Sequence, residues 1–474
     1  MKNTRSIPQI AEALAPTFEA LSHRVWHTPE TCYAEHASAA AHAEELERQG
    51  FAVTRGLAGI PTAVMGEAGQ GGPVIAILGE YDALPALSQE AGAAERRPLA
   101  EGGAGHGCGH NLLGAGSMLA ATAVKQWLEE QGLEGRVRYY GCPAEEGGAA
   151  KAFMVRAGLF DDVDAAFCWH PENFCEVIST GSLANIRVDF RFTGTSSHAA
   201  VAPHLGRSAL DAVELMSVGA NYLREHMTPD CRLHYAYLDA GGIAPNVVQG
   251  AAAVRYAVRA GDVAGMRDLY ERVCDVARGA ALMTGTRVEI TPISAVSDML
   301  LNAPMQTLMW EELEAMGPPA FDEEDRAFAA HMQTALSERD IADAFRRFGL
   351  KPVPGQALCE AVVPREAKRL LMLGSTDVAD VSRVVPLAQV HGATSAIGTP
   401  FHTWQLVAQG LSPMANKGMV HAGTVIARSA ARLIAEPETL AACRAAHEAA
   451  VAEDPYVSPL PEGTEPPIRE MAGA

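Results

Sequence analysis

The sequence predicts an α/β protein: a mainly parallel sheet with helices on both faces, into which a smaller ferredoxin-like α+β unit is inserted. Three observations support this fold class. The 474 residues exceed what one ordinary hydrophobic core covers, so two domains are expected. Between residues 73 and 169, short apolar runs alternate with helical segments, which is typical of a parallel sheet. Beyond Gly181, apolar and polar residues alternate, which indicates a second, half-exposed sheet.

Short apolar runs that end in polar residues define the strands of the first sheet. Residues 73–78 are almost wholly apolar, as expected for a strand buried on both faces. The next predicted elements are a helix over 111–130, a strand over 136–142, a helix over 148–157 and a strand over 164–169. In such folds the binding site lies at the carboxyl ends of the parallel strands. The polar residues that follow these strands, Asp82, Glu145, Glu146 and His170, are therefore expected to gather there.

The second sheet is predicted by a β-α-β-β-α-β order, which is that of a ferredoxin-like unit. Its expected elements are strands over 184–192, 232–240, 251–258 and 287–293, and helices over 208–226 and 262–283. Residues 184–296 are therefore predicted to form an inserted domain, and residues 1–183 and 297–474 the catalytic domain. Residues 301–350 are helix-rich without an assigned role, a strand over 387–396 and a helix over 418–435 close the catalytic domain, and the tail from 454 is expected to be irregular.

Composition and charge limit the function classes. The chain has 48% hydrophobic and 20% charged residues, which is ordinary for a soluble globular protein. A net charge of −20 disfavours nucleic acid and anionic membranes as partners, because like charges repel. No run approaches the ~18 to 20 apolar residues of a membrane span, and the first 24 residues lack the apolar core of a signal peptide. Nine cysteines without paired spacing suit a reducing compartment, so a cytoplasmic location is predicted.

The stretch Gly-His-Gly-Cys-Gly-His-Asn at 105–111 is the most informative feature for function. It places a thiol, Cys108, and an imidazole, His110, two residues apart on a loop that its glycines allow to bend sharply. Both groups are ligands for a divalent transition metal. A structural thiol beside an unrelated imidazole and a Cys-His nucleophile pair are the alternatives. Residues two apart on a tight loop rarely reach the attack geometry, so metal ligation is favoured.

Two adjacent carboxylates, Glu145 and Glu146, follow the strand over 136–142. Paired glutamates commonly open a solvated helix, where negative charge is favourable. After a buried strand and opposite the Cys108–His110 loop, they instead suit metal-assisted hydrolysis. One carboxylate binds the metal, and its neighbour takes a proton from the attacking water.

Two more histidines and one aspartate belong to the same predicted sheet edge. His170 ends the strand over 164–169, and His402 lies in a glycine-proline turn. A lone histidine is more often structural, but both are expected at the edge where the metal lacks imidazole ligands. Asp82 is expected to orient a ligand histidine, with a plain turn or helix-cap role as the alternative. His106 is assigned to the loop rather than to the ligands.

Three residues of the inserted domain suit an anionic group. His198 lies in a loop of small residues, Asn246 lies in the stretch 241–248, and Arg259 is placed on a neighbouring strand. Loop and sheet-surface positions are the plain interpretation. If all three face the metal cleft, their imidazole, amide and guanidinium groups form a clamp for a carboxylate.

The order of these motifs resembles the di-metal amidohydrolases, a family of aminoacylases, hippurate and auxin-conjugate hydrolases, and aminobenzoyl-glutamate hydrolases. The shared motifs are Glu-Tyr-Asp-Ala-Leu-Pro (80–85), Gly-Cys-Gly-His-Asn (107–111), Pro-Ala-Glu-Glu-Gly-Gly (143–148), His170, Gly-Thr-Ser-Ser-His-Ala (194–199), Gly-Gly-Ile-Ala-Pro-Asn-Val (241–247) and Gly-Thr-Pro-Phe-His (398–402). The resemblance spans roughly residues 10–435. Within the family, segments 79–82 and 375–382 look most like the B-type subunits of aminobenzoyl-glutamate hydrolases.

The resemblance implies a set of metal ligands and a general base. Two divalent ions per chain, manganese or zinc, would be bound by Cys108, His110, Glu146, His170 and His402, with Cys108 bridging. Glu145 would be the general base. Many relatives carry a ligand histidine two residues before Asp82, whereas this chain has Glu80, as in the subgroup that uses Cys-x-His.

The resemblance also implies a role for the inserted domain. This domain would form a dimer and a lid, with His198 reaching the neighbouring subunit's cleft. Asn246 and Arg259 match positions that contact the carboxylate or the oxyanion of the substrate.

These features predict a dimeric metallo-amidohydrolase that cleaves the amide of an N-acyl amino acid with a free carboxylate. The expected substrate is p-aminobenzoyl-glutamate or a related aryl- or acyl-amino acid. Three alternatives stay open: a dipeptidase of the same fold for β-alanyl or similar dipeptides, a non-catalytic partner of an unlike subunit in a hetero-oligomeric hydrolase, and a binding protein with one structural zinc at Cys108 and His110.

Overall fold

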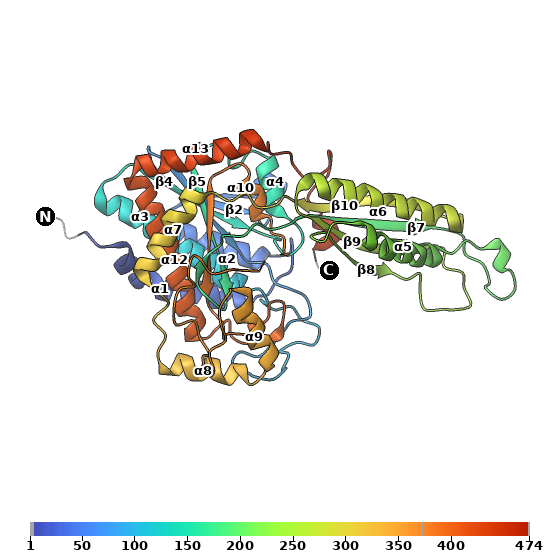
Figure 1. The fold of residues 1–474 in the computed structure, drawn as a ribbon, viewed down its shortest axis with the longest axis horizontal. Helices are drawn as coiled ribbons and strands as arrows, with labels where there is room; N and C mark the ends of the chain where they lie inside the picture. Colours follow the sequence, from blue (N-terminus) through green and yellow to red (C-terminus); the bar gives the residue numbers. More distant parts are fainter. Residues whose placement is uncertain (1–3, 371–372, 473–474) are drawn as a thin grey trace.

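The computed structural model describes residues 4–370 and 373–472. Figure 1 shows two units along the long axis of the molecule. The main unit is built round a seven-stranded sheet, and the inserted unit, residues 184–296, carries a separate four-stranded sheet and projects from the main unit. The predicted α/β class, with its second sheet of a different kind, is confirmed.

Parallel strands form the centre of the seven-stranded sheet, whose order is β1-β2-β4-β3-β5-β11-β6. Its strands are β1 (Ala52–Arg55), β2 (Val64–Gln70), β3 (Val74–Glu80), β4 (Gly135–Cys142), β5 (Ala165–Glu172), β6 (Glu176–Val177) and β11 (Leu387–Ala393). Strands β4, β3, β5 and β11 are parallel, and the outer pairs are antiparallel. Strand β1 was not predicted, because its four residues are mostly exposed and form no apolar run.

The central strands are buried on both faces. In β3, Ile75 and Ile77 contribute to one core, while Val74 and Leu78 contribute to the other. Helices α1 (Ile7–Trp26), α3 (His110–Gln131) and α12 (Pro413–Ala435) cover the first face, and α4 (Ala150–Arg156) and α10 (Val378–Ser382) cover the second. This arrangement confirms the predicted helices on both faces of the sheet.

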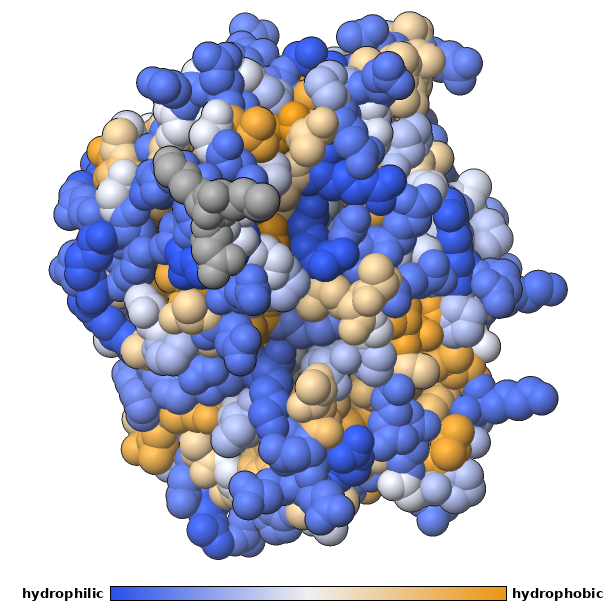
Figure 2. Space-filling view, turned by 90° about the vertical axis from the view of Figure 1, so that its left-hand side faces the viewer, coloured by the Kyte–Doolittle hydropathy of each residue, from blue (hydrophilic) through white to orange (hydrophobic). Residues whose placement is uncertain are grey.

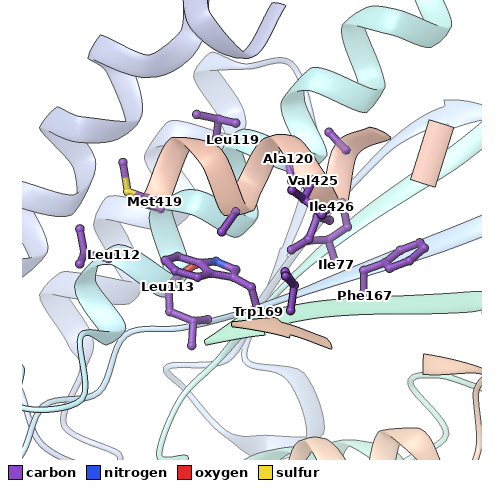
Figure 3. Packing of buried hydrophobic residues seen from close by; sticks show 14 of the residues in the cluster. Ile77, Leu112, Leu113, Leu119, Ala120, Phe167, Trp169, Met419, Val425 and Ile426 are labelled. Atoms are coloured by element: carbon purple, nitrogen blue, oxygen red, sulfur yellow. The ribbon is translucent and has the colours of Figure 1, made fainter. Parts of the chain in front are cut away.

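Trp169 of β5 fixes the start of helix α3 over the sheet. Its indole packs beside Leu112, Leu113 and Met419, and its Nε1–H donates to the Leu113 carbonyl oxygen over 3.0 Å (Figure 3). Gly114 of α3 lies so close to the Glu80 carbonyl oxygen that a Cβ there would collide with it. The first turn of α3 is thereby held against the carboxyl end of β3, where Glu80 and Asp82 lie.

The inserted unit has the predicted β-α-β-β-α-β order. Its elements are β7 (Ala184–Thr193), α5 (Ala209–Leu223), β8 (Arg232–Asp239), β9 (Ala251–Ala260), α6 (Val263–Thr284) and β10 (Arg287–Val296). The sheet order β10-β7-β9-β8 is antiparallel throughout, and α5 and α6 pack together on one of its faces. The opposite face is free of helices, and strand β8 forms an edge of the sheet.

The remaining elements surround the main unit. They are α2 (His36–Arg48), α7 (Ala303–Met316), α8 (Glu323–Gln333), α9 (Glu338–Arg347), α11 (Trp404–Val407), α13 (Pro437–Glu453), α14 (Ile468–Met471), and the short 3-10 helices η1 (Leu57–Gly59), η2 (Pro203–Leu205) and η3 (Arg224–His226). The tail beyond 454 is largely irregular, as expected. Hydrophilic residues cover most of the end of the main unit that faces away from the inserted unit (Figure 2). Within the described residues, no helix combines the length and apolarity of a membrane span.

Candidate active site

Side chains from four separate segments meet at the carboxyl ends of the parallel strands. Three groups of potential metal-ligating atoms lie within 4.8 Å of one another. They are Cys108 with His110 and His170, Cys108 with Glu146 and His402, and Glu80 with His110 and Glu145. All five residues predicted as ligands belong to these groups, and Cys108 is shared by two of them.

A buried carboxylate fixes the orientation of His110. This histidine is the first residue of α3, directly after Gly109, whose φ of 75° lies in the left-handed region. Its Nδ1 lies 2.9 Å from Asp82 Oδ1, and both side chains are fully buried. Burial disfavours the charged imidazole, but the Asp82 carboxylate overrides this cost and raises the pKa of His110. The hydrogen bond leaves Nε2 directed at the other candidate ligands, which is the geometry predicted for Asp82.

His170 presents a neutral imidazole to the Cys108 thiol. It lies within β5, which extends to Glu172, so it belongs to the strand rather than following it as expected. Its Nδ1 lies 2.8 Å from the Pro171 carbonyl oxygen, which only accepts hydrogen bonds, so Nδ1 carries the proton. Its Nε2 lone pair therefore faces Cys108 Sγ at 3.4 Å. Burial, followed by the nearby His110, lowers the pKa of His170 to about 3.

The two glutamates lie in a strained turn between β4 and α4. The flanking residues Ala144 and Ala149 both have φ of 56°, an unfavourable conformation for alanine that is typical of functional sites. The Glu146 backbone N–H donates to Asp82 Oδ2 over 2.8 Å, which ties this turn to the His110 carboxylate partner. Burial, followed by the charges of Glu80 and Glu146, raises the pKa of Glu145 well above its usual range.

His402 approaches from the loop before α11. Its backbone φ is 58°, a second strained position at the site, and its backbone N–H donates to the Gly107 carbonyl oxygen over 2.8 Å. The Nε2 atom lies 3.3 Å from Glu146 Oε2, and the His402 side chain is 55% exposed. The exposed imidazole marks the side of the site that is open to solvent.

A fully buried ion-pair network lies behind the glutamates, and the sequence did not reveal it. Lys151 Nζ donates to Glu80 Oε1 over 2.7 Å and to Asp377 Oδ1 over 2.6 Å. The other Glu80 oxygen, Oε2, lies 3.3 Å from His110 Nε2. A signal was available in the sequence, because Lys151 is the charged residue of the otherwise apolar run Ala-Lys-Ala-Phe-Met-Val (150–155).

The donor set fits divalent metal ions. Among the described residues, His110 Nε2, Glu80 Oε2 and Glu146 Oε1 are buried without a hydrogen-bond partner, and all three belong to the groups above. Buried polar atoms normally have a partner, so three such atoms facing each other indicate a place for cations. Thiol, imidazole and carboxylate donors suit zinc or manganese.

His106 does not face the site. Its Nε2 lies 3.1 Å from the Val25 carbonyl oxygen on α1, and burial lowers the pKa of His106 to about 4. This agrees with its assignment to the loop. A histidine that the sequence did not single out, His391 of β11, pairs with His170 across the parallel strands and has Nδ1 at 3.2 Å from Glu176 Oε1.

The inserted unit contributes residues at its root, beside the main unit. Arg259 Nη1 donates to Ser375 Oγ over 3.1 Å, and Arg187 Nη1 donates to the Glu146 carbonyl oxygen over 3.0 Å. Both guanidinium groups line a cavity of about 30 Å³ together with Glu145. Arg187 was not predicted, because a charged residue in an alternating strand is normally a surface residue.

His198 and Asn246 lie at the opposite end of the inserted unit. The Ala199 backbone N–H donates to the Asn246 carbonyl oxygen over 2.9 Å, so these two loops lie together. They adjoin the start of β9 at Ala251, whereas Arg259 lies near its end. Eight residues of strand span about 27 Å, so one chain does not bring all three clamp residues together.

Comparisons with known proteins agree with this geometry. The sequence profile of peptidase family M20/M25/M40 matches residues 76–360. The B-type subunit of the p-aminobenzoyl-glutamate hydrolase of Escherichia coli (strain K12) is 44% identical over 473 residues, which covers 98% of each chain. The Xaa-Arg dipeptidase of Mus musculus is 34% identical over 304 residues, 60% of this chain and 64% of the mouse protein.

Solved structures show the same fold. A Bacillus subtilis protein described as a dinuclear metal binding peptidase from the M20 family superposes with a TM-score of 0.55. It is 16% identical, and the match covers 90% of this chain and 99% of that protein. At this identity the likeness supports the fold alone, including the combination of a catalytic unit with a second, smaller unit.

Proposed function

Because this chain belongs to peptidase family M20/M25/M40, we propose that it is a metal-dependent amidohydrolase that releases an amino acid from an N-acyl amino acid. The observation that carries the proposal is the meeting of Cys108, His110, Glu146, His170 and His402 beside the buried Glu145. We further propose p-aminobenzoyl-glutamate, or a related aryl-amino acid, as the substrate. Its support is the 44% identity, over nearly the whole chain, to a relative with that name.

In the proposed reaction, Glu145 is the general base. Two divalent ions, manganese or zinc, held by the five ligands would polarise the amide carbonyl and acidify the attacking water. Glu145 accepts a proton from that water and then gives it to the leaving amine. Its burial beside the candidate ligands supports this role, because a proton acceptor acts through direct contact with the water. Asp82 holds His110 in the ligating orientation.

We propose that a second copy of this chain completes the carboxylate clamp. Arg259 lies at the root of the inserted unit near Glu145, whereas His198 and Asn246 lie at its far end. His198 Nδ1 accepts from the backbone N–H groups of Ala200 and Val201, so its Nε2–H is the free donor of an exposed ring. In a dimer, this end of one inserted unit would reach the cleft of the other subunit.

The surface of the inserted unit supports this dimer. Residues 184–296 would then act as a dimerisation and lid domain, with the edge strand β8 and the neighbouring helix α5 at the interface. Large apolar side chains are exposed on these two elements: Leu215, Val218, Tyr222, Tyr235, Tyr237 and Leu238. An edge strand with exposed apolar side chains is a template for pairing with another chain.

A complementation experiment tests the shared site. We expect Glu145→Gln and His198→Ala each to be inactive alone, and their mixture to regain about a quarter of wild-type activity after subunit exchange. Half of randomly formed dimers are mixed, and each mixed dimer keeps one intact cleft of two. The measurement is amide hydrolysis after unfolding and refolding the mixture. A mixture as inactive as its components would show that His198 acts within its own chain or not at all.

Removal of metal tests the cofactor. Dialysis against a chelator is expected to abolish hydrolysis, and reloading with manganese or zinc to restore it with two ions per chain by elemental analysis. Binding to the folded state alone also raises the melting temperature with metal concentration. One tightly held ion without activity would support the structural-zinc alternative.

A substrate panel separates the remaining alternatives. It contains p-aminobenzoyl-glutamate, other N-acyl amino acids, and β-alanyl and Xaa-Arg dipeptides. Release of glutamate supports the proposed substrate, and cleavage of dipeptides alone supports a dipeptidase. Two bound metals without turnover would indicate a need for an unlike subunit, as the name of the E. coli relative suggests for that protein. A cytoplasmic location is also proposed, and the nine free thiols support it.

A further inference from the structure

Four arginines on the helix-free face of the inserted sheet divide into two groups. Arg191 and Arg255 both bind the fully buried Asp189, Arg255 through a 2.6 Å contact and Arg191 through a 3.1 Å contact. Arg187 and Arg259 have no carboxylate within 4.0 Å among residues 4–370 and 373–472. The second group therefore carries two charges that the described chain leaves without a counterion.

The strand register places these two guanidinium groups side by side. On β7 and β9, Asn185 is opposite Arg259, and Arg187 is opposite Ala257. Arg187 and Arg259 are therefore diagonal neighbours on one face, within reach of each other's long side chains. The small side chain of Ala257 leaves room between them. In a chain of net charge −20, two adjacent cations that repel each other indicate a bound anion.

The cavity between them has unused polar atoms. It is lined by Asn185, Arg187, Arg259, Glu145 and Ser375, among others. Within the described chain, Arg259 Nε and Asn185 Oδ1 are buried and lack hydrogen-bond partners. Burial, followed by the charge of Arg187, lowers the pKa of Arg259. An anion placed here would satisfy the Arg259 donor and separate the two charges.

The backbone is shaped to admit the Arg187 side chain. A Cβ on Gly147 would collide with the guanidinium, and the φ of Gly147 is 152°. The guanidinium packs against this turn while Nη1 donates to the Glu146 carbonyl oxygen. Ser294, opposite Arg187 on β10, donates to the Gly147 carbonyl oxygen over 2.6 Å. Arg187 is thus held at the wall of the cleft beside Glu145.

We propose that Arg187 and Arg259 form a two-guanidinium subsite that selects an acidic amino acid, with Arg259 on the α-carboxylate and Arg187 on the side-chain carboxylate of the substrate. This inference rests on the proposed amidohydrolase function and adds a specificity residue to it. The second carboxylate distinguishes N-acyl-glutamate from N-acyl-glutamine, which has the same shape without the charge. Selectivity then follows from a bidentate pair that the neutral amide does not form.

The test compares p-aminobenzoyl-glutamate with p-aminobenzoyl-glutamine as substrates of metal-loaded protein. Wild type is expected to prefer the glutamate compound, and Arg187→Gln to lower this preference about 10- to 100-fold, the loss expected for a hydrogen bond between charged groups. Arg191→Gln is the matched control on the same strand and face, where Arg255 still binds Asp189, and it should keep the preference. A loop-holding role alone would lower both rates equally, and that result would overturn the proposal.

Direct binding separates failure of this inference from failure of the proposed function. Calorimetric titration with the same two compounds uses no turnover, so it remains informative if neither compound is cleaved. Tighter binding of the glutamate compound that disappears in Arg187→Gln supports the subsite even for an inactive protein. Equal affinity of wild type for both compounds would overturn it, whatever amides the enzyme cleaves.

Discussion

Glu145→Gln is expected to lower kcat by about 10²- to 10⁴-fold, the contribution typical of a general base. The substitution keeps the size of a side chain that lies in a strained, buried turn, so the fold should not change. Glutamine has no basic oxygen to accept the water proton or to pass it to the leaving amine. Steady-state hydrolysis and elemental analysis of the same sample are the measurements.

Metal content distinguishes a base from a ligand at this position. Glu145 lies in one ligand group with Glu80 and His110, so its role requires this comparison. A base leaves two ions per chain in Glu145→Gln, whereas Glu146→Gln is the matched variant expected to lose metal. Full activity of Glu145→Gln, or loss of an ion from it, would contradict the assignment of the base.

Lys151→Met is expected to destabilise the metal-free protein by about 3 to 5 kcal/mol, the cost of removing one partner from a buried ion pair. Lys151 is fully buried between Glu80 and Asp377. Burial alone would lower the pKa of this lysine, but the two carboxylates override it and raise the pKa, so the ammonium stays charged. Methionine fills similar space and leaves two buried carboxylates without a cation. Urea unfolding of chelated protein measures the change.

Two companion variants isolate the electrostatic cause. Lys125→Met removes a surface pair with Glu129 and should cost about 1 kcal/mol or less. Adding Asp377→Asn to Lys151→Met should recover part of the lost stability, because it removes one of the unpaired charges. A Lys151→Met protein as stable as wild type would show that the network adds nothing to folding. In that case, its position beside His110 would leave the site as its remaining role.

Most of the fold was predictable from local patterns. The apolar run 74–80 and the strict alternation in 184–193 each have a single explanation, a strand buried on both faces and a strand buried on one. The helix that begins at His110 was predicted to within one residue. The weak points were β1, whose exposed residues carry no periodic signal, and the carboxyl end of β5, which continues through His170.

The candidate ligands were predictable for a different reason. Cys108, His110, Glu145 and Glu146 are short-range motifs on loops that follow strands, and the topology of a parallel sheet brings such loops to one edge. A sequence pattern therefore carried both the chemistry and the meeting place. The sequence also implied that His402 would join them from the far end of the chain, through the family resemblance rather than through spacing.

By itself, the sequence determined the order of the two sheets, the ligand motifs and the reaction class they suit, because each is written in neighbouring residues. Only the tertiary structure decided which charges meet in the interior. Lys151 and Asp377 are 226 residues apart, and Arg187 and Arg259 come from different strands. It also separated Arg259 from His198 and Asn246. Burial and strand register set these distances, and both arise only when distant segments pack together.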